Sequence, residues 1–421
     1  MKYLAQFNLL CLLIVGLLIS TSCRDVQEAK FLPLKYTLTS ERIPLDFFES
    51  FQPYVMELKN GFLIFNYFDV VQIYSASDYS FACNLSSRRT QPIFQTAQIL
   101  RSSLPYLYII DVNNKNEITK YSIDSLGQPT LLQTSYTGIN IAMNRPYIVN
   151  DSLIIYDEFV PEAALKILDL HTNKEVQALP YGTTSIDERF YDKNMGGMYV
   201  NDSCIAFAYK YQDRIDFYDW TFNLKHSVNH QKSEAVINIP VDVYDRPENT
   251  IYYGSSYMGR NYFYTLYRGV TNKVFRSDSL LVLGSPGVYI HGIIRDVLEV
   301  YDLEGQPICR FSFNDVAPEV FVVDEEHNIL YGYRQVYSET LLVYSLQGLP
   351  KNNMKRPEYQ RPLYSSLPFI KPDTSKIISY FEAAGTSEGV APVYWIKRFL
   401  DAGGYRSVTN AGNFGLTELS K

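Results

Sequence analysis

The sequence carries few residue patterns that could support catalysis or metal binding. His226 and His230 are four residues apart, a spacing that would place both imidazoles on one face of a helix and suit a metal ion. The pair follows a strand hairpin, lacks the glutamate of an H-E-x-x-H motif and has no third ligand nearby, so we interpret it as a surface loop. No G-x-S-x-G elbow, phosphate-binding loop or dinucleotide fingerprint occurs. The sequence therefore predicts no catalytic residue, no metal site and no cofactor.

Tyrosine and arginine residues gather between Tyr252 and Arg268. Both residue types are favoured at recognition surfaces, and loops on a rigid scaffold often carry function. Most of these tyrosines have the spacing of buried strand residues. Tyr257 and Arg260, within the segment Gly254–Arg260, are the two that we expect in a loop, and we predict that this loop binds a ligand.

The charge balance argues against a nucleic-acid partner. The chain of 421 residues has 38 basic and 45 acidic residues, a formal net charge of −7 and no long basic run. Its 36 Tyr and 24 Phe favour half-buried strands, so we expect mostly β structure.

The N-terminus has the features of an export signal. Lys2 is followed by an apolar run from Leu9 to Ile19, which has the length of a signal-peptide core and is too short to span a bilayer. The following Ser20–Cys23 segment resembles a bacterial lipobox, although Ser20 stands where an apolar residue is usual. The resemblance implies removal of residues 1–22 and attachment of lipid to Cys23, which would anchor the protein to the membrane. A plain secretory signal is the alternative.

The other cysteines give no disulfide framework or metal motif. Cys11 leaves with the signal, and Cys83, Cys204 and Cys309 are far apart and lie in or beside apolar strands. We expect them to be small buried hydrophobic residues.

A repeat along the chain indicates the architecture. Six apolar strands end in an aromatic or aliphatic residue followed by Ser or Asp, and four of the five intervals between them measure 43 to 50 residues, the fifth 83. The six penultimate residues are Tyr74, Tyr121, Leu168, Tyr218, Tyr301 and Tyr344. Each has a partner strand just upstream and a turn between. Turn-rich units of this period are typical of β-propeller blades, so we predict six blades over residues 36–350.

Four longer segments add to the repeat: Asn194–Asp219, Tyr262–Gly269, Val300–Pro307 and Phe321–Tyr331. Through them the chain resembles the TolB-like, six-bladed propeller lipoproteins of Bacteroidetes, and the resemblance covers about three quarters of the chain. It implies an all-β propeller in the cell envelope, and it implies little about function.

The C-terminal residues depart from the repeat. We predict a linker over 351–375 and a small α/β tail over 376–421, with a helix that begins at Pro392 and ends before Gly403. The strand–loop–helix order and the segment Gly404–Asn413 resemble the second half of a rhodanese domain. That family's catalytic cysteine would fall near Glu382, and no Cys follows Cys309, so we predict no sulfurtransferase activity.

These observations lead to one functional hypothesis with an alternative. We expect a signal peptide at 1–22, a linker at 23–35, and a lipid-anchored propeller of the cell envelope, on either face of the outer membrane. It would serve as a non-catalytic binding or scaffold module for a protein or glycan partner. The alternative is a glycan-active hydrolase or lyase that uses carboxylates or His in the propeller channel, because 45 acidic residues allow many pairings that sequence alone does not resolve.

Overall fold

The computed structural model describes residues 36–49, 53, 55–87, 93–111, 117–137, 146–158, 164–180, 196–230, 250–271, 296–315, 317–334, 337 and 339–349. The predicted signal peptide, the lipidation site Cys23, both linkers and the α/β tail lie outside these residues. Within them, all regular elements longer than a turn are strands, and no helix is long and apolar enough to cross a membrane. The all-β prediction is confirmed for this part of the chain.

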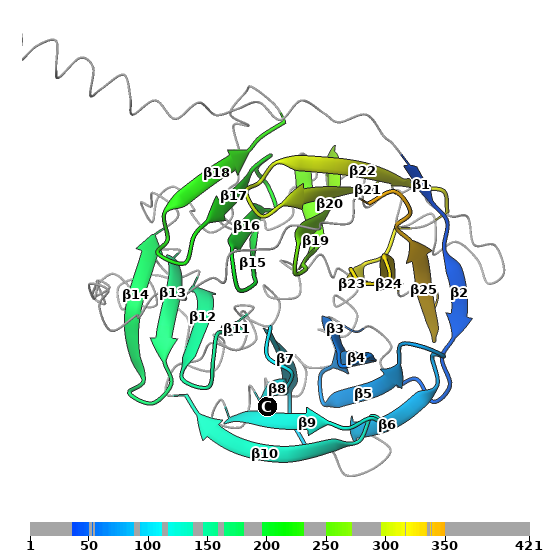
Figure 1. Ribbon diagram of the computed structural model, residues 1–421, viewed down its shortest axis with the longest axis vertical. Coiled ribbons are helices and arrows are strands. Elements are labelled where there is room, and N and C mark those ends of the chain that lie inside the picture. The colour runs from blue at the N-terminus through cyan, green and yellow to red at the C-terminus, as the bar shows by residue number, and fades with distance from the viewer. Residues whose placement is uncertain are drawn as a thin grey trace, which may run out of the picture.

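The strands are arranged around a common centre, as in a β-propeller (Figure 1). One sheet contains β3 (Val55–Lys59), β4 (Phe62–Tyr67), β5 (Val70–Ser75) and β6 (Phe81–Ser86). Another contains β15 (Gly196–Val200), β16 (Ile205–Tyr209), β17 (Ile215–Tyr218) and β18 (Leu224–Val228). In both, antiparallel neighbours follow one another in chain order from the centre outward.

The largest sheet has eight strands in the order β10-β9-β8-β7-β11-β12-β13-β14. Its first half contains β7 (Ala97–Ser102), β8 (Leu107–Asp111), β9 (Glu117–Ile123) and β10 (Pro129–Tyr136). Its second half contains β11 (Tyr147–Ile148), β12 (Leu153–Glu158), β13 (Ala164–Asp169) and β14 (Lys174–Pro180). The halves meet through a short parallel pairing in which Tyr147 lies opposite Arg101 and Ile148 opposite Ser102. The described strands thus form five hydrogen-bonded sheets, whereas six separate blades would form six.

Two N-terminal strands complete the sheets formed by the end of the chain. Strand β1 (Tyr36–Leu38) pairs in parallel with β22 (Pro307–Phe313), beyond β21 (Val297–Asp302), β20 (Tyr262–Thr271) and β19 (Thr250–Met258). Strand β2 (Glu41–Pro44) pairs with β25 (Thr340–Ser345), beside β24 (Ile329–Tyr333) and β23 (Val320–Asp324). Because strands from both ends of the described chain share these sheets, the ring is closed by hydrogen bonds.

The repeated sequence segments form the third strand of successive groups, namely β5, β9, β13, β17, β21 and β25. All six penultimate residues are buried, so these tyrosines serve the packing between strands. The Asp that follows them stabilises the next turn. Asp219 Oδ1 accepts hydrogen bonds from the amides of Thr221 and Asn223, both at 2.9 Å. Asp302 does the same for Glu304 and Gln306.

Hydrophobic clusters fill the space between neighbouring groups of strands. In one, Ile155 and Ile167 of the eight-stranded sheet pack against Phe207 and Trp220 of the sheet that begins with β15. Others join β3–β6 to β7–β10 and β23–β25 to β3–β6 in the same way. Burial of this apolar surface holds the ring together.

Candidate functional site

The strands nearest the centre are β3, β7, β11, β15, β19 and β23, and the turns that follow them lie at one end of the ring (Figure 1). We call this end the inner-hairpin mouth, formed by the turns at 60–61, 103–106, 149–152, 201–204, 259–261 and 325–328. The first of these turns, Asn60-Gly61, has positive φ at both residues (51° and 80°), the backbone of a two-residue hairpin.

Polar side chains tie several of these turns to one another. Asn60 Nδ2 donates to the carbonyl of Pro105 at 3.1 Å, and Ser103 Oγ donates to Asp202 at 2.5 Å. Asn201 Nδ2 donates to the carbonyl of Gly259 at 2.7 Å. These bonds make the mouth a set of loops that hold one another in place, which is the arrangement that precise binding requires.

One carboxylate, that of Glu325, connects the 325–328 turn to the 259–261 turn. Glu325 Oε2 accepts from the backbone and side-chain nitrogens of Asn261, at 2.8 and 2.9 Å. Its other oxygen accepts from Tyr262 N and the Tyr264 hydroxyl, at 3.0 and 3.2 Å. Glu325 is therefore occupied in positioning the turn that carries Arg260.

Three side chains meet at the axis below these turns, and we call them the axial cluster: Glu57, Arg101 and Tyr257. Arg101 on β7 lies 3.8 Å from Glu57 on β3, measured from Nε to Oε2, and its guanidinium carbon is 5.2 Å from the centre of the Tyr257 ring. Strands β7 and β19 stand on opposite sides of the ring (Figure 1). A contact between side chains from opposite strands must therefore lie close to the centre.

The axial cluster contains an unsatisfied polar atom. Glu57 is 5% exposed, and its buried Oε2 has no hydrogen-bond partner among the described residues. A buried oxygen that lacks a hydrogen bond costs about 1–3 kcal/mol of folding free energy, so it favours a bound donor. The side chain of Arg101, beside this atom, is 25% exposed.

Lys59 supports the cluster from the same strand as Glu57. Its ammonium donates to the carbonyls of Ser102 and Leu104, the latter at 3.0 Å. Burial lowers the pKa of Lys59, and the negative charges of Glu57 and Asp202 oppose that effect. The lysine therefore fixes the 103–106 turn against β3.

The two predicted ligand-binding residues are placed differently by the structure. Arg260 is exposed in the turn after β19, as expected of a loop residue. Tyr257 lies within β19, so the prediction that it belongs to a loop is wrong. The strand is nine residues long, with register shifts between Ile251 and Ser256 that the sequence does not reveal. Burial raises the pKa of the Tyr257 hydroxyl, with Glu57 as the next cause.

The surface-loop interpretation of His230 is also wrong. Its side chain is 4% exposed and lies between two carboxylates, with Nδ1 2.8 Å from Asp213 and Nε2 3.4 Å from Glu299. Tyr301 donates to Glu299 at 2.6 Å, and Arg310 Nε lies 3.0 Å from the other oxygen of Glu299. With Tyr253, whose hydroxyl is 3.2 Å from Asp213, these residues form the His230 cluster.

The carboxylates set the charge of His230. Burial alone would lower the pKa of its imidazole, but the hydrogen bonds to Asp213 and Glu299 outweigh it and raise the pKa to about 9. His230 is thus protonated at neutral pH. Because Asp213 and His230 belong to the β15–β18 part and Glu299 to β21, the cluster joins two neighbouring sheets.

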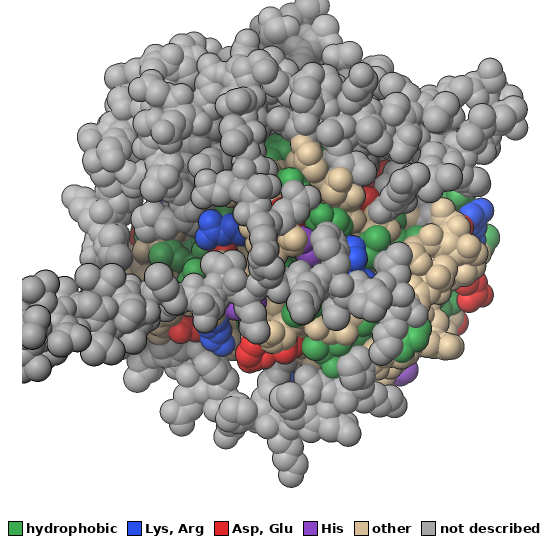
Figure 2. All heavy atoms as spheres, turned by 90° about the horizontal axis from the view of Figure 1, so that it is seen from above, with side chains coloured by type: hydrophobic (Ala, Val, Ile, Leu, Met, Phe, Trp, Pro, Cys, Tyr) green, Lys and Arg blue, Asp and Glu red, His purple; other side chains and the backbone are tan. Residues whose placement is uncertain are grey.

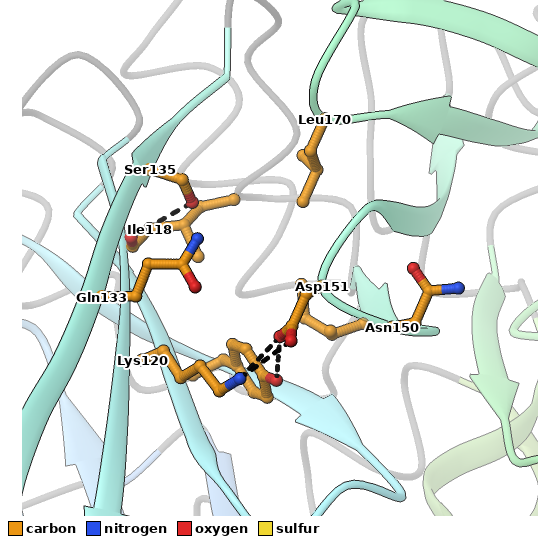
Figure 3. Close-up of a pocket in the computed structure, with 9 residues that line it drawn as sticks. Ile118, Lys120, Gln133, Ser135, Asn150, Asp151 and Leu170 are labelled. Carbon is orange, nitrogen blue, oxygen red and sulfur yellow. Dashed lines mark hydrogen bonds and ion pairs between the residues drawn. The ribbon is translucent and has the colours of Figure 1, made fainter.

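An open cleft lies between the two halves of the eight-stranded sheet. Figure 3 shows Gln133 and Ser135 of β10 on one side and Leu170 on the other. Lys120 Nζ bridges the seam to Asp151 at 2.8 Å, and Tyr108 donates to the same carboxylate at 2.9 Å. The space, counted with the solvent at its mouth, is about 270 Å³, below the usual range for small-molecule sites.

The cysteines in the described part of the chain are free thiols. Cys204 and Cys309 are buried, as predicted. Cys83 is half-buried and donates to the carbonyl of Gly127 at 3.4 Å, and burial raises its pKa to about 11. The described residues contain no cluster of three or more His, Cys, Asp or Glu side chains that could hold a metal ion.

No protein-family model matches the chain, and no curated protein matches it. The candidate site therefore rests on its geometry. Sequence reasoning found Arg260 and Tyr257 but missed Glu57 and Arg101. The sequence feature that could have pointed to Glu57 is a charged residue inside a mostly apolar strand, as in Val55–Lys59.

Proposed function

We propose that the protein is a lipid-anchored β-propeller of the cell envelope that binds a protein or glycan partner at the inner-hairpin mouth and catalyses no reaction. The axial cluster, with Arg260 exposed above it, carries this proposal. A buried carboxylate oxygen that has no hydrogen-bond partner among the described residues lies 3.8 Å from a guanidinium nitrogen, and hydrogen bonds hold the surrounding turns. Such convergent polar groups on a rigid scaffold are typical of binding sites.

We further propose that the ring has six blades and belongs with the TolB-like propeller lipoproteins of Bacteroidetes. The eight-stranded sheet then counts as two blades, since the strand pairing between its described halves is limited to two residue pairs, Tyr147–Arg101 and Ile148–Ser102. Each half is a run of four antiparallel strands, like the sheets on either side. This count agrees with the six sequence repeats.

Anchoring through lipid on Cys23 places the propeller at the outer membrane, on either face. Replacing Cys23 with Ala removes the thiol that would carry the lipid. We expect the Cys23→Ala chain to move from the membrane to the soluble fraction of the envelope. Unchanged fractionation would refute lipid anchoring and leave the plain secretory signal.

The enzymatic alternative has less support from the described residues. A glycosidase needs two carboxyl groups facing one bond, one of which is free to act as an acid. At the axis, one oxygen of Glu57 has no hydrogen bond to a described residue, whereas both oxygens of Glu325 accept hydrogen bonds from the turn that it positions. We also propose that the rhodanese-like tail does not transfer sulfur, because it lacks a cysteine.

Binding is tested by immobilising the full chain and passing over it the polysaccharide and the membrane-protein fractions of its own envelope. We expect retention of material from one fraction, and its loss with Arg260→Ala. Lys174→Ala is the matched control, since Lys174 is also an exposed cation and lies on the outer strand β14. Equal loss with both variants, or none with Arg260→Ala, would contradict a site at the mouth. Shortening of the polysaccharide would establish the enzymatic alternative.

A further inference from the structure

The axial cluster contains a hydrogen-bond acceptor and a set of donors that do not reach each other. Glu57 Oε2 and Arg101 Nε are 3.8 Å apart, which is longer than a hydrogen bond. Glu57 is 5% exposed, and no hydrogen bond joins its Oε2 or the Arg101 guanidinium to a described residue. Polar groups at such a distance are commonly bridged by one oxygen atom that bonds to both. A bridging atom would therefore satisfy both side chains.

The chemistry of the two side chains defines the bridging group. A carboxylate only accepts hydrogen bonds and a guanidinium only donates them, so the bridging atom must donate to Glu57 and accept from Arg101. An ammonium group has no acceptor and a ligand carboxylate has no donor, whereas a hydroxyl oxygen has both. Water has the same property, so a ligand with hydroxyl groups reproduces the bonds of the water molecule that it displaces.

The surrounding charges favour a neutral ligand. The charges of Glu57, Asp202 and Arg101 all act on Lys59, which lies on the same strand as Glu57. These four side chains are two acids and two bases, so a charged ligand would be attracted by one pair and repelled by the other. On the side of the ring shown in Figure 2, acidic and basic side chains of the described residues are also intermixed, and this face has no broad region of one sign.

We propose that the axial cluster is a subsite for one neutral sugar residue of a glycan. One sugar hydroxyl donates to Glu57 Oε2 and accepts from Arg101 Nε. Adjacent hydroxyls accept from the other N–H groups of Arg101, because a guanidinium has five N–H donors in one plane. A sugar presents these hydroxyls on a rigid ring, so little conformational freedom is lost when several bonds form. The inference rests on the proposed binding function of the inner-hairpin mouth, and it selects a glycan over a protein as the partner.

The test is saturation-transfer NMR of the full chain, in a detergent without a sugar headgroup, with glucose, galactose, mannose and xylose as probes. We expect at least one of these neutral sugars to bind with a dissociation constant of about 1 mM, as suits so small a ligand. Acetate and methylammonium, which carry a charge and no hydroxyl, should not displace it. Glu57→Gln should weaken sugar binding at least about tenfold, because a neutral amide replaces a charged acceptor. Arg101→Lys should act in the same direction, because it removes the planar set of donors and keeps the charge.

Glu304→Gln is the matched control, because Glu304 is an exposed glutamate in the turn between β21 and β22, outside the axial cluster. It should bind the sugar as the unaltered chain does, and circular dichroism should show native folding for all variants. Binding of acetate or methylammonium without binding of a sugar would overturn the proposal, as would sugar binding that Glu57→Gln leaves unchanged.

The sugar subsite and the proposed function would fail with different results. If no neutral sugar binds, the sugar subsite is wrong, and a membrane protein retained through Arg260 would still support a binding site at the inner-hairpin mouth. If the mouth also retains nothing from either envelope fraction, both proposals are wrong.

Discussion

The axial cluster and the His230 cluster both bury carboxylates beside cationic side chains and tyrosines, but they differ in how closely the carboxylates are paired. In the His230 cluster, two carboxylates face an imidazolium, an arginine and tyrosine hydroxyls at 2.6 to 3.4 Å. In the axial cluster, the ion pair of Glu57 with Arg101 is longer, at 3.8 Å, and Glu57 Oε2 has no hydrogen-bond partner among the described residues. Glu299 Oε1 also lacks a hydrogen bond to a described residue, but it lies 3.0 Å from Arg310 Nε, while the other oxygen of Glu299 lies 3.4 Å from His230. Close charge pairing on both oxygens indicates a structural role, and the longer contact of Glu57 at the mouth of the ring indicates a place for a ligand.

Removal of His230 should give the largest effect. His230→Ala leaves Asp213 and Glu299 buried without their shared cation, which we expect to cost about 3–5 kcal/mol of unfolding free energy. Urea unfolding measures the loss. His327→Ala is the control, because His327 is exposed beside Asp324 and its removal should leave the midpoint unchanged. A His230 variant as stable as the control would show that the cluster does not stabilise the contact between the two sheets.

The pH dependence of stability follows from the same histidine. Its pKa is raised to about 9 in the folded protein from about 6.5 unfolded, so protonation stabilises the fold. This contribution, about 3 kcal/mol, is complete below pH 6.5 and disappears as pH rises through 9. Unfolding curves between these pH values should show a falling midpoint that His230→Ala lacks. Parallel curves for both chains would mean that His230 is neutral in the folded state.

A matched pair of amide substitutions compares the clusters directly. Glu299→Gln removes the charge that faces both His230 and Arg310, and we expect it to cost about 2–3 kcal/mol. Glu57→Gln removes a poorly paired buried charge, so we expect a change of less than about 1 kcal/mol. Urea unfolding of both variants tests the difference. Equal losses of unfolding free energy would mean that Glu57 contributes as much to stability as Glu299 does.

Arg260 should have the smallest effect on stability. Its side chain is exposed in a turn, and surface substitutions of this kind usually change the unfolding free energy by no more than about 0.5 kcal/mol. Arg260→Ala should therefore unfold at the same urea concentration as the unaltered chain while it loses the bound partner. A large loss of stability would instead show that Arg260 helps to hold the neighbouring turns together.

The repeat in the sequence predicts the third strand of each group because it records local requirements: an apolar strand, a buried aromatic residue and an aspartate that accepts hydrogen bonds from the turn. It does not predict the five-sheet count, since the pairing of Tyr147 with Arg101 joins strands separated by a whole repeat. For the same reason the axial cluster was missed. Glu57, Arg101 and Tyr257 are distant in sequence, and closure of the ring brings them together.

The His230 cluster also shows that spacing along the sequence does not predict contacts between distant segments. The i, i+4 spacing with His226 drew attention to metal binding, but His226 and His230 are separated by the end of strand β18. The relevant neighbours are Asp213, on the adjoining hairpin, and Glu299, on the next sheet. Spacing along one segment reports contacts within a helix or hairpin, and the contacts between sheets decide the chemistry here.

The proposal that the inner-hairpin mouth is the binding site is tested most directly by a crystal structure of the full chain purified from its own envelope. The account predicts electron density larger than a water molecule at the mouth, with a donor at Glu57 Oε2 and contacts to Arg101 and Arg260. A mouth that holds water alone, or a ligand bound in the cleft between β10 and Leu170 instead, would contradict it.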